Sequence, residues 1–244
     1  MLKYQRNYKI APDFKHQEWV ISKAEAALTE PIPHITDMVS ERSAGGIHDY
    51  YSNGDYWWPN PDTPDGLPYI HRDGETNPGN FNGHRMMLRK MRTNVVYLSY
   101  AYKLTKEEKY ADFATRMLKE FFLDEDTKMN PHLSYAQALP GICEGRGIGI
   151  IDTLHLVDVP FAIEVLTTSN AMTEDIYKGL KKWFARYLGW MLTDENGIAE
   201  MNTTNNHSVC FFVQAAAFAL FTDNERIADF CREHYKHVLM KQMA

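Results

Sequence analysis

Two kinds of helical segment alternate along this chain, and that alternation constrains the fold more than any other feature. Residues 147–168 and 204–221 are apolar on nearly every face, as is typical of helices enclosed by neighbours. Pro160 predicts a break or kink in the first of them. The other helical segments are apolar on one face only, and they cover residues 14–29, 82–104, 105–122, 173–192 and the stretch from 222 onward. Inner helices need an outer layer, so the pattern predicts an all-α fold of stacked antiparallel hairpins.

Capping residues predict where the outer helices begin. Thr105 with Glu108, and Thr222 with Glu225, have the spacing of a capping box, in which each side chain bonds the backbone of the other residue. Thr173 has the position of an N-cap and precedes two acidic residues, which the positive end of a helix favours. No β-strand pattern of any length is present, which supports the all-α prediction.

The length of 244 residues predicts one domain, residues 1–244, with one sizeable core. A net charge of −6 argues against general nucleic-acid binding, because no domain-wide basic field is present. No apolar run approaches the length of a membrane span, and the first residues lack the apolar region of a signal peptide. The three cysteines are widely spaced, so they predict neither a disulfide framework nor a metal site, and no cofactor is expected.

Residues 43–81 interrupt the helical pattern with a long segment, which we call the aromatic loop. Glycines and prolines alternate there with tyrosines and tryptophans. A loop this long inside a compact domain is either functional or disordered, and disordered segments are poor in aromatic residues. The composition therefore favours a functional loop. The alternative is that its rings only plug the end of a helical barrel.

The rings of the aromatic loop have the composition of a sugar-binding surface. Sugars are bound by aromatic faces against their C–H surfaces, with polar groups reaching the hydroxyls. Large aromatic residues also dominate protein cores, so each ring has a structural alternative. The candidates for substrate binding are Tyr50, Tyr51, Tyr56, Trp57 and Trp58.

A basic stripe follows the aromatic loop. Arg85, Arg89 and Arg92 share one face of the predicted helix, and arginine binds carboxylates through two parallel hydrogen bonds. A solvated face accounts for Arg89 and Arg92. Arg85 adjoins the loop and is the candidate for contacting an acidic ligand.

Three polar residues, Asp152, His155 and Asp158, recur on one side of an otherwise apolar helical segment. A metal site is conceivable at this spacing. A cluster of buried, hydrogen-bonded side chains is the simpler interpretation.

Small residues surround Arg146 in the sequence Gly145-Arg146-Gly147. They would let its guanidinium lie close to the backbone or to a ligand, although a buried structural arginine bonded to carbonyls is an equal alternative. The segment 130–137 lies just upstream and contributes Tyr135 and Gln137 as candidate substrate contacts.

The sharpest chemical signal is the triplet Asn205-Asn206-His207, which opens the apolar segment 204–221. Three adjacent polar groups are costly to bury without partners. A helix N-terminus favours a nearby anion, and histidine exchanges a proton close to neutral pH. The triplet therefore predicts a site that binds a carboxylate and moves a proton beside it.

The chain resembles bacterial alginate lyase-domain proteins over roughly residues 25–240. The resemblance is carried, in chain order, by residues 48–59, which match the lid-loop region of that family, and by residues 130–137, 145–147 and 205–207. The combination is far more specific than any one of these motifs. It implies an (α/α) toroid or incomplete toroid, a periplasmic or secreted bacterial carbon–oxygen lyase, and an acidic polysaccharide cleaved by β-elimination.

Family resemblance also implies roles for individual residues. Neutralisation of the uronate carboxylate would fall to Asn206 and His207 with Arg146, and proton transfer to a histidine and a tyrosine. These roles agree with the chemistry of the residues, because amide donors and an imidazolium stabilise a developing enolate. We therefore predict that His207, Asn206, Arg146 and residues 56–58 converge on one cleft.

The chain departs from the family pattern after the triplet. The family's catalytic tyrosine follows the Asn-His motif, but Tyr235 is the one tyrosine after His207 and does not fit. The chain thus resembles the N-terminal two-thirds of a member, and a phenol from Tyr50, Tyr51 or Tyr56 is an alternative donor. Helix 204–221 should then expose an apolar edge at the C-terminal side, through which the chain could self-associate.

Two other functions remain open at this point. One is an inactive or truncated carbohydrate-binding domain that keeps the aromatic and arginine contacts. The other is a glycoside hydrolase on the same fold, which needs two suitably separated carboxylates. The aromatic loop offers Asp49, Asp55, Asp62 and Asp65.

Overall fold

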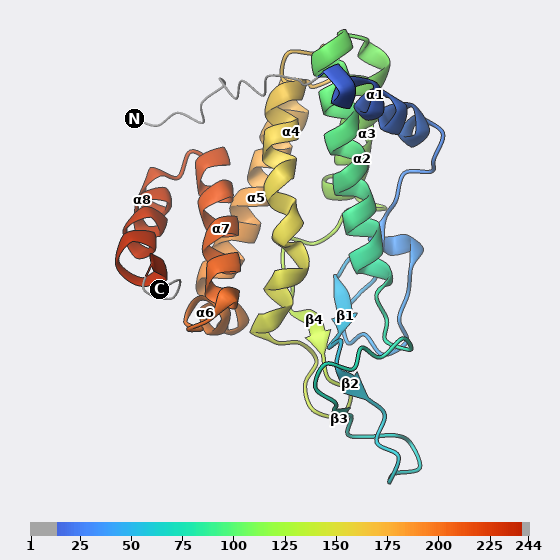
Figure 1. The fold of residues 1–244 in the computed structure, drawn as a ribbon, viewed down its shortest axis with the longest axis vertical. Helices are drawn as coiled ribbons and strands as arrows, with labels where there is room; N and C mark the ends of the chain where they lie inside the picture. The colour runs from blue at the N-terminus through green and yellow to red at the C-terminus, as the bar shows by residue number, and fades with distance from the viewer. Residues whose placement is uncertain (1–13, 241–244) are drawn as a thin grey trace.

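Eight α-helices make up most of the described chain, which is residues 14–240 of a computed structural model (Figure 1). Neighbouring helices pack in pairs, among them α1 with α2, α2 with α3, and α7 with α8. The predicted all-α fold of stacked hairpins is confirmed. The helices are α1 (Phe14–Leu28), α2 (Gly83–Thr105), α3 (Glu108–Phe122), α4 (Asp158–Leu166), α5 (Glu174–Thr193), α6 (Glu195–Met201), α7 (Asn206–Phe221) and α8 (Glu225–His234).

The inner segment 147–168 is not one continuous α-helix. It starts as the 3₁₀ helix η2 (Gly147–Val157) and continues as α4. Pro160 is the third residue of α4. The backbone stays helical at the junction, because Val157 and Asp158 both have right-handed helical angles, so the segment changes helix type before Pro160 and is not broken at it. Leu156 in η2 and Phe218 in α7 are both fully buried in the core between the layers.

Only one of the three predicted caps is formed as expected. The hydroxyl of Thr173 accepts from the third backbone N–H of α5, as predicted. Thr105 and Thr222 instead lie at the C-terminal ends of α2 and α7, where each hydroxyl donates to the carbonyl four residues earlier. Glu107 and Asn224 occupy the N-cap positions of the next helices. Both predicted capping boxes were wrong because a threonine hydroxyl serves the end of one helix as readily as the start of another.

Short strands hold the aromatic loop together beyond one end of the helices (Figure 1). Strand β1 (Tyr51–Asn53) pairs in parallel with β4 (Tyr135–Ala138), and β2 (Trp57–Trp58) pairs antiparallel with β3 (Ile70–His71). The sequence had shown no strand pattern, because runs of two to four residues are too short for an alternation of polar and apolar side chains to be recognised. The loop is thus an ordered part of the fold.

The remaining helical turns are short. They are the 3₁₀ helix η1 (Ile35–Asp37) and η3 (Tyr235–Leu239), a π-helical turn that continues α8. No helix among the described residues is long and apolar enough to cross a membrane.

His84 anchors the start of the aromatic loop to α2. Its Nδ1 accepts from the backbone N–H of Tyr51 at 2.8 Å, and its Nε2 lies 2.7 Å from the carbonyl of Met38. These partners require a neutral ring with the proton on Nε2. Burial accordingly lowers the pKa of His84 below its ordinary value of 6.5.

We expect His84 to make the protein less stable in mild acid. Because the folded pKa is depressed, its contribution to stability is complete above the unfolded pKa of about 6.5 and is lost as the pH falls through the lower folded pKa. The free energy of unfolding should therefore decrease below about pH 6.5, and less steeply for His84→Gln. Urea titrations at several pH values measure both slopes. Equal slopes for the two proteins would exclude His84 as the cause.

Candidate active site

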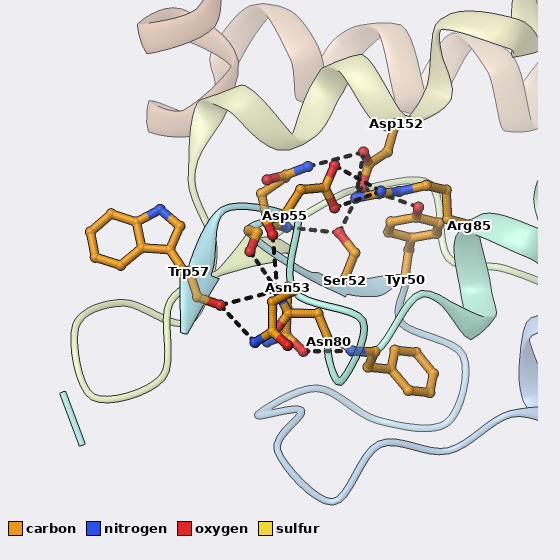
Figure 2. A network of polar contacts seen from close by, with 12 residues as sticks. Tyr50, Ser52, Asn53, Asp55, Trp57, Asn80, Arg85 and Asp152 are labelled. Atoms are coloured by element: carbon orange, nitrogen blue, oxygen red, sulfur yellow. Dashed lines mark hydrogen bonds and ion pairs between the residues drawn. The ribbon is translucent and has the colours of Figure 1, made fainter. Parts of the chain in front are cut away.

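A buried carboxylate, Asp152, connects the aromatic loop to the inner helices. Only 3% of Asp152 is exposed. Its oxygens accept from the hydroxyls of Ser52 at 2.6 Å and Tyr50 at 3.2 Å, and from the amide of Gln137 at 3.3 Å. The guanidinium of Arg85 lies 3.1 Å away (Figure 2). Asp152 of η2 therefore makes polar contacts with residues of β1, β4 and α2.

Arg85, predicted to contact the substrate, is occupied by two carboxylates of the protein. Its Nη1 donates to both oxygens of Asp55, at 2.8 and 3.1 Å, and its Nη2 pairs with Asp152 (Figure 2). Burial opposes the charge of Arg85, but these carboxylates outweigh burial and raise its pKa. The arrangement makes Arg85 a link between the loop and α2.

The polar residues on residues 147–168 do not form one cluster. Asp152 turns towards Arg85, whereas Asp158 accepts from Nε of Arg92 at 2.7 Å. Burial and the nearby arginines lower the pKa of His155. Within residues 14–240, no group of three or more histidine, cysteine, aspartate or glutamate side chains could hold a metal ion.

Three asparagines position the rim of the aromatic loop around Trp57. The amide of Asn77 donates to the Trp57 carbonyl at 2.9 Å, and that of Asn80 donates to the Gly54 carbonyl at 2.7 Å. The side chain of Asn53 accepts from the backbone N–H of Phe81 at 3.0 Å. Figure 2 shows the Trp57 ring pointing away from the polar network, so the loop presents this ring to its surroundings.

The predicted aromatic contacts fall into two groups. Tyr50 and Tyr51 are buried, so neither ring forms an exposed face, although Tyr51 is among the residues that line a pocket. Tyr56 is 42% exposed, and Trp57 and Trp58 are half-buried. Tyr50 and Tyr51 thus occupy the protein core, as the structural alternative for aromatic residues predicts. The aromatic surface open to a ligand is made by residues 56–58.

Trp58 and the predicted contact Tyr135 are held by neighbours. The indole of Trp58 donates to the Glu75 carbonyl at 2.9 Å, and Arg72 lies 4.8 Å from its ring centre. Tyr135 is half-buried, with its ring 2.5 Å from where a side-chain carbon on Gly45 would lie. Each ring is therefore fixed in orientation.

Arg146 makes the carbonyl contact of its structural alternative and also lies near an aromatic ring. Its Nε donates to the Gln137 carbonyl at 3.0 Å, and its Nη2 donates to the Gln137 side chain at 3.4 Å. The same guanidinium lies 6.0 Å from the centre of the Trp57 ring. Burial lowers the pKa of Arg146, although nearby acidic groups act in the opposite direction. Gln137 thus connects Arg146 to Asp152 and is a positioning group in this structure.

Flanking glycines allow this close approach. A Cβ on Gly145 would lie 2.0 Å from the carbonyl oxygen of Ser134, and a Cβ on Gly147 would lie 2.5 Å from that of Asn196.

We expect Gly145→Ala to lower the free energy of unfolding by about 1–3 kcal/mol through overpacking. The matched control is Gly189→Ala in the middle of α5, where nothing lies within 4 Å. It should stabilise the protein by about 0.4–1 kcal/mol. Urea unfolding of both variants tests this pair, and changes of the same sign would contradict it.

The triplet forms the predicted helix start, but its first amide is used for capping. The side chain of Asn205 accepts from the backbone N–H of His207 at 3.0 Å. Asn206 is the first residue of α7 and is exposed. The His207 ring is partly exposed, and its Nδ1 lies 2.7 Å from Oε1 of Glu200.

Glu200 was not identified from the sequence. It lies in α6, a helix of seven residues that begins with the cap Asp194 and that the periodicity did not reveal. Glu200 is 1% exposed, and burial raises its pKa although His207 and Arg146 favour its charged form. One signal was available, because a carboxylate in the last turn of a helix faces the negative end of the helix dipole. Such a residue needs a specific partner.

Contacts connect the separate motifs into one continuous group. Glu200 bonds His207 and interacts electrostatically with Arg146, and Arg146 faces Trp57. A pocket of about 390 Å³ adjoins this group and is lined by Tyr51, Leu139 and Cys143, among others. Four elements that lie far apart in the sequence therefore meet at the loop end of the helices.

Comparisons with known proteins identify the family of this chain and its fold. A family model described as alginate lyase matches residues 34–244. The crystal structure of an alginate lyase from Bacteroides ovatus is 38% identical in sequence and superposes with a TM-score of 0.86. The match covers 91% of this chain and 59% of that one, so this chain spans less than two-thirds of its length. The predicted α/α toroid fold is confirmed by this likeness. No curated protein matches the chain.

Proposed function

Because this chain belongs to the alginate lyase family, we propose that it forms part of a polysaccharide lyase that cleaves a uronate polymer by β-elimination. The observation that carries the proposal is the hydrogen-bonded pair of His207 and Glu200 beside Arg146 and Trp57. A base, a cation and an aromatic face in one group are what such a reaction needs. A polymer of this kind occurs outside the cytoplasm. We therefore propose that this chain is periplasmic or secreted, as expected for a member of the family.

Each residue has a chemical task in this proposal. Arg146 and Asn206 bind the uronate carboxylate and favour the charge that develops when the C5 proton leaves. His207 takes that proton, a double bond forms between C4 and C5, and the C4–O bond to the next sugar breaks. Trp57 and Tyr56 pack against sugar rings. Tyr135 and Trp58 extend this contact surface.

A proton must also reach the leaving oxygen. Tyr50 is an unsuitable donor, because burial and Asp152 raise its pKa well above 10.0. Tyr51 is buried, which raises its pKa, and its phenol oxygen accepts from Asn53. Among the three candidate tyrosines, the exposed Tyr56 is the one accessible to a substrate.

The carboxylates that a glycoside hydrolase would need are mostly engaged in contacts within the protein. Asp49 accepts from Asn130 at 2.7 Å and lies 3.0 Å from His132, and Asp55 pairs with Arg85. Asp65 accepts from a backbone N–H within its own turn. Three of the four candidate loop carboxylates therefore make structural contacts, and Asp62 alone is not a pair, which supports elimination over hydrolysis.

One assay separates the functions. The protein is incubated with alginate, and the far-ultraviolet absorbance of the unsaturated product is followed together with new reducing ends. A lyase produces one double bond for each new reducing end. Reducing ends without absorbance would establish hydrolysis, and retention on an alginate column without either product would establish a binding domain.

We also propose that the last helices mediate self-association. α7 was predicted to be enclosed, but Val213 in its middle is 46% exposed. Phe230, Tyr235 and Val238 in the following helical segment are also exposed, and exposed apolar side chains that gather into a patch favour association. We expect a dimer or larger species in sedimentation velocity at micromolar concentration, and a monomer for Val213→Glu. Ile47→Glu in the aromatic loop is the control. A monomeric parent protein would contradict the proposal.

A further inference from the structure

Among residues 14–240, Glu200 is the carboxylate that contacts His207, and the geometry of the pair restricts where protons can lie. Oε1 of Glu200 is 2.7 Å from Nδ1 of His207. The other oxygen, Oε2, is buried and has no hydrogen-bond partner among the described residues. An ionised carboxylate can only accept hydrogen bonds. The proton of this bond is then carried by Nδ1.

Surrounding groups keep Glu200 in place, and His207 and Arg146 favour its ionised form against the larger effect of burial, which raises its pKa. Gly147 packs against α6 so closely that a Cβ there would lie 3.1 Å from the backbone nitrogen of Glu200. This contact brings the preceding Arg146 near the carboxylate, and the positive charge of Arg146 opposes the effect of burial. On α7, Cys210 also faces Glu200, which together with burial raises the pKa of that thiol.

We propose that Glu200 is a positioning residue that holds the proton of His207 on Nδ1 and so leaves Nε2 free to accept the C5 proton of the substrate. The inference rests on the lyase function proposed above and deepens it. When Nε2 takes the proton, the ring becomes an imidazolium, and the adjacent carboxylate stabilises that charge. Glu200 itself touches no substrate. The relation corresponds to the carboxylate that orients the histidine in serine proteases.

The test combines a spectroscopic and a kinetic readout. Long-range ¹H–¹⁵N correlation spectra of ¹⁵N-histidine-labelled protein, recorded under basic conditions in which the ring is neutral, report which nitrogen of His207 carries the proton. We expect a protonated Nδ1 and an unprotonated Nε2. Glu200→Gln introduces an amide that can donate to Nδ1, so the signature should be lost and kcat should fall about 100-fold or more with little change in KM.

Two further variants separate positioning from folding. Glu200→Asp keeps the charge and should retain the Nδ1 proton and recover much of kcat. Glu195→Gln, an exposed change on the same helix, should alter neither readout. Because the folded pKa of Glu200 is raised, its charge costs stability at neutral pH. Glu200→Gln should therefore unfold at the same temperature as the parent protein or higher.

Two results would overturn the inference. One is a proton on Nε2 in the parent protein, which would make Glu200 the donor. The other is a Glu200→Gln variant with the parent's kcat. A parent protein that shows the expected Nδ1 proton but eliminates no uronate polymer would instead refute the lyase function and leave the proton assignment standing.

Discussion

Replacing His207 with alanine is expected to reduce turnover of a uronate polymer about 100-fold or more while the protein still unfolds cooperatively. The loss reflects about 3 kcal/mol of transition-state stabilisation that the imidazole supplies as base and charge partner. The ring is partly exposed and makes its hydrogen bond with Glu200, so its removal disturbs little of the core. Initial rates from product absorbance, together with thermal unfolding, measure both effects.

The control for this variant is His237→Ala. His237 is largely exposed and pairs with the exposed Glu233, one helical turn earlier, so its removal should change neither rate nor unfolding. A His207→Ala protein that retains turnover within tenfold of the parent would show that another group removes the C5 proton.

Replacing Asp152 with alanine should produce the largest loss of stability, about 3–5 kcal/mol in the free energy of unfolding. The change removes the acceptor of Ser52, Tyr50 and Gln137 and leaves Arg85 with one carboxylate instead of two. Buried donors without partners are costly. Urea unfolding followed by tyrosine and tryptophan fluorescence measures the loss.

Asp158→Ala is a matched control for this prediction. Asp158 lies six residues after Asp152 and also pairs with an arginine of α2, but both partners are about one-third exposed, at 37% and 30%. Solvent-exposed ion pairs contribute at most about 1 kcal/mol. Similar losses for the two variants would show that burial does not decide the importance of Asp152.

The helices could be predicted from the sequence because their evidence is local. The apolar periodicity of residues 83–105 and the cap at Thr173 involve neighbours within four residues. The errors also had local causes: Thr105 and Thr222 can serve either end of a helix, and α6 is too short to show periodicity. A threonine hydroxyl can cap either end of a helix, and a run of seven residues can adopt more than one conformation. Tertiary packing decides which of these is formed.

The site could be predicted only in part, because its contacts join distant residues. His207 and Arg146 stood out by their immediate neighbours in the sequence. Asp152 was noticed, but its link with Arg85 bridges 67 residues, and the bond between His84 and Tyr51 bridges 33. Glu200 gained significance only from the packing of α6 against η2 and α7. Burial raises the pKa of Glu200, and the spacing of residues in the sequence does not reveal that burial.

The parallel pairing of β1 with β4 has a consequence for how the protein acquires its function during folding. Tyr51 and Tyr135 are register partners, and the chain between them includes the whole α2–α3 hairpin. Closing so long a loop costs conformational entropy that two short strands cannot repay alone. We expect the hairpin to form first from local contacts and to bring the strand ends together. The proposed binding of an acidic polymer would then be gained at the end of folding, and ligand protection would report on fully assembled molecules only.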